Sequence, residues 1–162
     1  MLNLYPNQTQ KYLFTAGSIP EPVDLYQLTL TPLFTTLDND TEFLVHDSGP
    51  GSNRVFLFST ETNMELLSRC STIFSDGTFS TAPTNLFCQL YTVHGEISAG
   101  DEKIVVALVY AFLPNKLQQT YEKVMEVIRG KVDLNPRTWI VDFEKDAVNA
   151  TEKFWPNVTR GC

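Results

Sequence analysis

The sequence predicts an α/β fold, with a mixed sheet of three antiparallel strands plus a parallel fourth and with two or three helices. Three β-prone segments follow one another between residues 73 and 113. Two amphipathic helical patterns come after them, and a fourth β-prone segment separates these two patterns. The chain of 162 residues, 43% hydrophobic and 19% charged, fits one folded domain.

Residues 1–53 are predicted to form an irregular arm that is rich in Pro and Thr. Five prolines interrupt any helical period there. Within the arm, residues 42–46 can form a short strand before residues 47–51, a run of turn formers that favours a tight loop. The domain proper is expected over residues 54–162.

The domain is expected to begin with a strand and a short helix. Residues 55–58 are apolar and β-prone. Thr62 with Glu65 three residues later is a capping-box signal, and the helix that it starts is predicted to end near Cys70.

Three consecutive strands then predict a meander. They cover residues 73–79, 86–94 and 104–113. The second of them alternates, with Phe87, Gln89, Tyr91 and Val93 on one face. The third is almost continuously apolar, as expected for a strand that is buried on both faces.

An amphipathic helix follows the meander, and a fourth strand follows the helix. The helix is predicted from one apolar face, formed by Leu117, Tyr121, Val124, Met125 and Ile128. Gly130 stands where a helix stop belongs. Residues 138–143 are short and β-prone and end near Asp142. A second helix is predicted up to Pro156, and Val158 can begin a fifth strand.

Two carboxylates are predicted to meet in this topology. A right-handed crossover places the fourth strand parallel to the first and beside it, so Asp76 and Asp142 can lie on strands about 5 Å apart. Neighbouring carboxylates repel each other, and Mg²⁺ or Mn²⁺ between them removes the repulsion. The structural alternative is that Asp76 starts an Asp-Gly turn and Asp142 ends a strand.

A two-metal site for phosphoryl transfer needs more than this pair, because a third acid usually holds the second ion. Glu144 and Asp146 are near Asp142 in sequence. They belong to a predicted helix start, where the helix dipole favours acids, so neither is a convincing third ligand.

His94 and the three cysteines give weaker signals. Cys88 and His94 share a strand face but are separated by about 20 Å, which argues against a nucleophile pair. Together with Cys70 and Cys162, these two residues include no close pair of zinc ligands. The wide spacing of the three cysteines favours reduced thiols in an intracellular compartment.

Charge and hydropathy exclude some partners. The net charge of −7 disfavours an autonomous nucleic-acid-binding module, which recruits clustered cations. No stretch approaches the roughly 18 apolar residues of a membrane span, and no signal peptide is evident, so no membrane partner is expected.

Five motifs, in order, resemble the transposase domain of Mutator-like elements (MULE). They are D-S-G-P-G at 47–51, F-S-D-G-T-F-S-T-A-P at 74–83, Q-L-Y-T-V-H-G at 89–95, A-F-L-P-N-K at 111–116 and D-F-E-K at 142–145. The resemblance runs from about residue 42 to the last residue. It implies an RNase H-like fold and a D-D-E triad that cleaves and joins DNA ends with Mg²⁺ or Mn²⁺. Asp76 matches the first acid and Asp142 the second.

The resemblance also implies an incomplete domain. Gly161-Cys162 resembles the start of a Cys-x-x-His signature, but its His and the helix with the third acid do not follow. The expectation is therefore a fragment of a DDE transposase, inactive as an isolated chain, whose family partner is transposon-end DNA and whose family location is the nucleus. The alternative is a domesticated or decayed remnant that acts as a non-enzymatic interaction module, associating with protein or with itself through the incomplete sheet.

Overall fold

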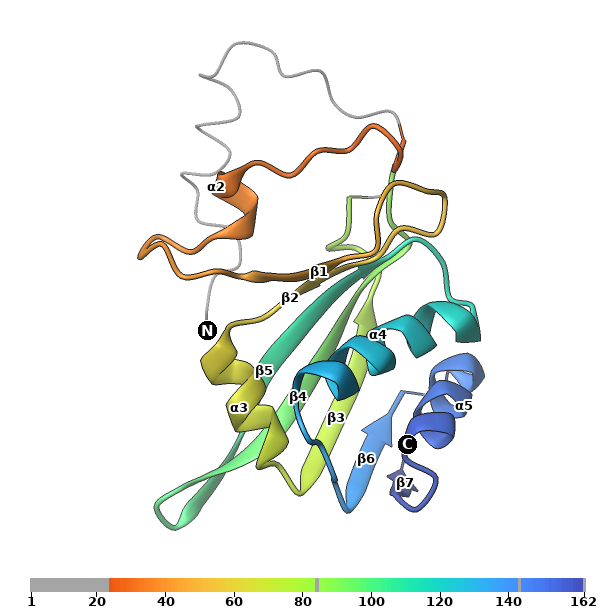
Figure 1. The fold of residues 1–162 in the computed structure, drawn as a ribbon. Helices are drawn as coiled ribbons and strands as arrows, with labels where there is room; N and C mark the ends of the chain where they lie inside the picture. The colour runs from red at the N-terminus through yellow and green to blue at the C-terminus, as the bar shows by residue number, and fades with distance from the viewer. Residues whose placement is uncertain (1–23, 84, 143, 162) are drawn as a thin grey trace.

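The computed structural model describes residues 24–161 except 84 and 143. These residues form one mixed sheet of seven strands in the order β1-β2-β5-β4-β3-β6-β7, with four helices (Figure 1). The strands are β1 (Leu44–Asp47), β2 (Phe56–Phe58), β3 (Thr72–Thr78), β4 (Gln89–Ala99), β5 (Glu102–Leu113), β6 (Thr138–Val141) and β7 (Thr159–Gly161). The helices are α2 (Pro32–Thr35), α3 (Glu61–Ser68), α4 (Gln118–Lys131) and α5 (Lys145–Phe154). The α/β class is confirmed.

The predicted meander is confirmed, because β4 pairs antiparallel with both β3 and β5. β4 begins three residues later than the expected 86. The N–H groups of Leu86 and Phe87 both donate to the carbonyl of Pro83, at 3.0 and 2.9 Å, and so form a turn before the strand. The β4–β5 hairpin also continues beyond residue 94, to a turn at Gly100 with a φ of +66°.

The predicted fourth strand is confirmed as parallel and adjacent to the first. β6 pairs with β3 from Thr72–Thr138 to Ser75–Val141. The predicted helix between the meander and this strand is α4, whose buried face includes Val124. This crossover sets the carboxyl ends of β3 and β6 at the same edge of the sheet.

The prediction of four strands was wrong in number. β2 pairs with β5 and β1 pairs with β2, both antiparallel, and β7 adds in parallel to β6. β1 overlaps the short strand that the sequence allowed at residues 42–46 within the arm, β2 matches the strand predicted at residues 55–58, and β7 follows Val158, where a fifth strand could begin. These strands have three or four residues each, and the predicted sheet of four strands did not include them.

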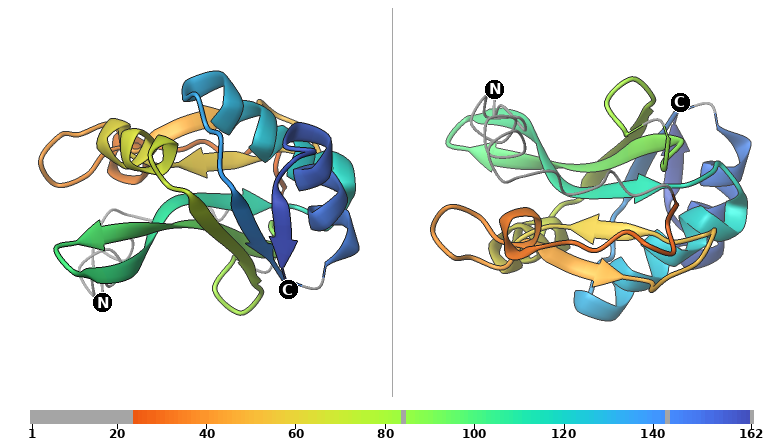
Figure 2. Two further views of the ribbon diagram at one scale, coloured as in Figure 1. Left: turned by 90° about the horizontal axis from the view of Figure 1, so that it is seen from below. Right: turned by 90° about the horizontal axis from the view of Figure 1, so that it is seen from above.

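The main core lies between the sheet and α3, α4 and α5, which Figures 1 and 2 show on one side of the strands. Leu67 of α3, Val124 of α4 and Ala150 of α5 are fully buried there, with Ile73 and Trp139 of the sheet. A smaller, aromatic-rich cluster gathers around Phe56, Phe58 and Phe87, with Leu25 and Ala82. None of the helices among the described residues has both the length and the apolar composition that a membrane span needs.

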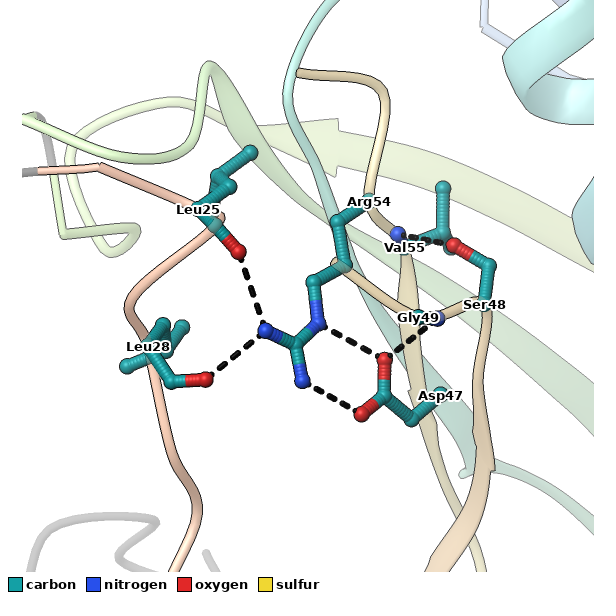
Figure 3. Close-up of polar contacts among 7 residues, drawn as sticks. All are labelled: Leu25, Leu28, Asp47, Ser48, Gly49, Arg54 and Val55. Atoms are coloured by element: carbon teal, nitrogen blue, oxygen red, sulfur yellow. Dashed lines mark hydrogen bonds and ion pairs between the residues drawn. The ribbon is translucent and has the colours of Figure 1, made fainter. Parts of the chain in front are cut away.

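A buried arginine ties the start of the described chain to the β1–β2 hairpin (Figure 3). Arg54 is 6% exposed and donates from Nε and Nη2 to the two carboxylate oxygens of Asp47, at 2.8 and 2.6 Å. Its Nη1 donates to the carbonyls of Leu25 and Leu28, at 2.9 and 2.7 Å. The Arg54 hydrogen bonds lower the pKa of Asp47 below its ordinary value. Asp47 also accepts the N–H of Gly49 at 2.9 Å, which forms the expected tight turn.

Candidate active site at the carboxyl ends of β3 and β6

The structure brings the two predicted site residues next to each other. The last registered pair of β3 and β6 is Ser75 with Val141, and the N–H of Asp142 still donates to the carbonyl of Ser75 at 3.3 Å. Asp76 and Asp142 are therefore the next neighbours on strands about 4.8 Å apart. Ser75 and Val141 are buried, so alternation directs both carboxylates to the opposite face, where both residues are exposed.

The connection that follows β5 reaches the same edge of the sheet. β5 and β3 are both antiparallel to β4, so they run in the same direction. Lys116 follows β5, and its Nζ lies 3.6 Å from the ring centroid of Phe79, which follows β3. Phe79 remains 45% exposed. An aromatic ring and a cation thus accompany the carboxylate pair at this edge.

Glu144 is held by two side chains from the neighbouring segments. Its carboxylate forms an ion pair with Lys116 and accepts the hydroxyl of Tyr121. Gln89 in turn donates from Nε2 to the Tyr121 hydroxyl, at 2.6 Å. Burial, and next the hydrogen bond to Glu144, raise the pKa of Tyr121, which therefore acts as a neutral donor. These contacts hold the Glu144 carboxylate between α4 and the connection that follows β5.

Asp146 also has a structural contact. Its Oδ2 accepts the N–H of Gln118 at 3.2 Å, which satisfies one donor at the start of α4. As predicted, both acids lie at a helix start: Glu144 immediately precedes α5, and Asp146 lies in its first turn.

Gln89 is a site-adjacent residue whose contacts sequence reasoning missed. It is fully buried, and its Oε1 has no hydrogen-bond partner among the described residues. A Cβ at Gly77 would lie only 2.1 Å from this oxygen, so any other residue after Asp76 requires the Gln89 side chain to shift. The sequence did contain a signal for these contacts. Gln89 is a polar amide on the strand face that it shares with Phe87, Tyr91 and Val93, and a buried amide needs hydrogen-bond partners.

The two carboxylates suit a magnesium or manganese ion that keeps several water ligands. They are too few to surround an ion with protein ligands alone. Within residues 24–161, apart from the two undescribed positions, no group of three or more His, Cys, Asp or Glu side chains can hold a metal ion. Asp76 and Asp142 supply two carboxylates. Mg²⁺ typically takes one or two carboxylates and keeps several water molecules.

His94 and the cysteines complete no metal-binding group of three with the pair among the described residues. His94 is half-buried on β4 opposite Phe74; burial lowers its pKa, while the charge of Asp76 acts in the opposite direction. Cys70 is buried and Cys88 is exposed just before β4, and both are free thiols. Cys162 lies outside the described residues.

Comparison with known proteins leaves the chain without an established family. No protein-family model matches it, and neither a curated protein nor a solved structure matches it significantly.

Proposed function

We propose that residues 54–162 form the N-terminal part of an RNase H-like MULE transposase domain, which carries out metal-dependent DNA strand cleavage and transfer. The observation that supports this proposal most is the adjacency of Asp76 and Asp142 at the carboxyl ends of β3 and β6. In the D-G-T-F and D-F-E motifs these are the two acids that the resemblance makes catalytic.

The proposed ion is Mg²⁺ or Mn²⁺, held by Asp76 and Asp142. Bound there, it supplies activation of the attacking oxygen and stabilisation of the leaving one. The fold of the chain positions the two acids that would hold the ion. The β3–β6 ladder and its last hydrogen bond, from Asp142 to Ser75, position the backbone of both acids, and Lys116 and Tyr121 hold the carboxylate of Glu144.

The proposed partner is transposon-end DNA, and the proposed location is the nucleus. Both rest on the resemblance. The net charge of −7 means that a DNA strand near the pair depends on the divalent ion for electrostatic attraction. Activity is proposed to require a third carboxylate, since no described residue adds one to the pair.

A strand-cleavage assay on supercoiled plasmid with Mn²⁺ tests this assignment. Residues 1–162 alone are expected to show no cleavage. Robust cleavage that Asp76→Ala abolishes would contradict the requirement for a further acid while supporting the catalytic role of Asp76. Cleavage that survives Asp76→Ala would contradict the role of the pair.

The second candidate is a non-enzymatic interaction module, which the edge position of β7 favours. β7 is the outermost strand beside β6, and it has three residues. Strand edges present unpaired backbone groups to other chains. Size-exclusion chromatography is expected to show self-association, and a monomer over a wide concentration range would contradict this candidate.

A further inference from the structure

An open hollow lies at the end of the sheet opposite to the carboxylate pair. Its volume is about 1050 Å³, and its walls are the connection from α4 to β6 and the connection from α5 to β7. Arg137 immediately precedes β6 whereas Asp142 immediately follows it, so the hollow and the pair lie at the two ends of the same strand.

Unneutralised positive charge is concentrated around this hollow. Of the eleven Lys and Arg residues that the structure describes, five form ion pairs with described residues. Three of the remaining six, Arg129, Lys131 and Arg137, line the hollow, and all three are exposed. Asp133 is the single acidic residue in the lining as described. The chain as a whole has a net charge of −7, so the excess of cations around the hollow differs from the overall charge of the protein.

The two walls are held together before any ligand arrives. The indole N–H of Trp155 donates to the carbonyl of Leu134 at 2.7 Å, across the hollow's two connections. Trp155 is 7% exposed, and its ring lies 4.8 Å from that of Trp139. A preformed site loses less conformational entropy when it binds a ligand.

Helix dipoles explain only part of the charge. Arg129 and Lys131 are in the last turn of α4, where cations are favoured in any protein. Arg137 is at no helix end; its N–H donates to the carbonyl of Ser71 at 2.9 Å, before β3 and β6 begin to pair. Its guanidinium makes no ion pair with a described residue, so Arg137 is the position that separates a binding role from dipole compensation.

We propose that this hollow binds phosphate groups, with Arg137 as the principal contact and Arg129 and Lys131 as supporting charges. A guanidinium offers paired N–H donors that match two phosphate oxygens. Free phosphate and the phosphodiester backbone of DNA share this chemistry. The proposal does not depend on the function of Asp76 and Asp142.

The test uses residues 1–162 with two probes, inorganic phosphate and a short DNA duplex. Both are titrated while the amide NMR signals of the non-proline residues in 131–137 and 154–158 are followed. Arg137→Gln is expected to weaken binding about fivefold, and with the duplex to reduce the slope of log affinity against log salt by about one. Arg69→Gln is the matched control, because Arg69 is also exposed and makes no ion pair with a described residue.

The outcomes separate the ligand sources and the competing sites. If Arg137→Gln weakens the binding of both probes, or of the duplex alone, the proposal is supported and the ligand can be the DNA backbone. If only phosphate binds, and Arg137→Gln weakens that binding, the proposal is supported and the ligand is a free phosphate anion. The proposal is overturned if neither probe shifts these signals, if Arg69→Gln weakens binding as much, or if Asp76→Asn does so.

Discussion

Asp47 and Asp76 both lie on strands of the same sheet, yet their surroundings differ. Asp47 faces the buried guanidinium of Arg54, which meets both of its oxygens and joins it to two backbone carbonyls of the preceding segment. Asp76 makes no ion pair with a described residue, and its neighbour across the ladder is another carboxylate, Asp142. The first arrangement stabilises the fold, whereas the second places two exposed carboxylates at one edge of the sheet, where we propose that they bind a metal ion.

This difference implies opposite responses to substitution. Removing a charge from the Arg54–Asp47 ion pair should lower the free energy of unfolding. Removing the charge of Asp76 should leave stability equal or higher, because Asp76 makes no ion pair with a described residue.

The largest effect is expected from Arg54→Met. The substitution keeps an apolar stem but leaves Asp47 and the carbonyls of Leu25 and Leu28 without the guanidinium, so the free energy of unfolding should fall by about 3 kcal/mol. Urea denaturation measures this. Lys103→Met is the control, since Lys103 pairs with Glu96 at an exposed position and should change stability by less than about 1 kcal/mol. Equal effects of the two substitutions would contradict the structural role of Arg54.

Gly77→Ala is expected to cost about 1–3 kcal/mol, because the added methyl group overlaps the buried Oε1 of Gln89. The substitution tests whether the backbone beside Asp76 is fixed by packing. Gly130→Ala is a matched control within α4, where an added Cβ meets nothing within 4 Å, and it should stabilise the protein slightly. A neutral Gly77→Ala would show that Gln89 can move without cost.

The pH dependence should report Asp47. Its pKa is lower in the folded state than the ordinary value of 3.8, so its contribution is present above that value and is lost as pH falls below it towards the folded-state pKa. Chemical denaturation at successive pH values should therefore show a steeper acidic loss of stability for the natural chain than for Asp47→Asn. Parallel curves for the two proteins would count against the Arg54–Asp47 coupling.

The smallest change in stability is expected from Asp76→Asn. Neutralising one of two neighbouring carboxylates removes a like-charge contact, so the free energy of unfolding should stay equal or rise by about 0.5 kcal/mol. Thermal unfolding without divalent ions provides the measurement. A loss greater than about 1 kcal/mol would show that Asp76 has the structural role of an ordinary turn or strand residue.

The strand order around the carboxylates could be predicted because its signals are strong and local. Alternation in residues 86–94, the apolar run of 104–113 and the helix pattern after it define a meander and a crossover. The handedness of the crossover then places β6 beside β3, which brings Asp76 and Asp142 together.

The remaining features depend on contacts that no local pattern contains. Arg54 reaches the carbonyl of Leu25, 29 positions away, and Gln89 reaches Tyr121, 32 positions away. The sequence allowed strands at residues 42–46 and 55–58 but not their partners: β2 pairs with β5, and β1 pairs with β2. Short segments of this kind are decided by tertiary pairing and not by their own periodicity.

Manganese binding tests the central claim most directly. Mn²⁺ is titrated into residues 1–162 while paramagnetic broadening of the amide NMR signals is followed residue by residue. Broadening is expected first at residues 76–78 and 142–145, and it should be strongly reduced in Asp76→Asn and in Asp142→Asn but not in Asp101→Asn, a control at an exposed hairpin turn. Broadening centred elsewhere, or unchanged by Asp76→Asn, would contradict the assignment of the pair as a metal site.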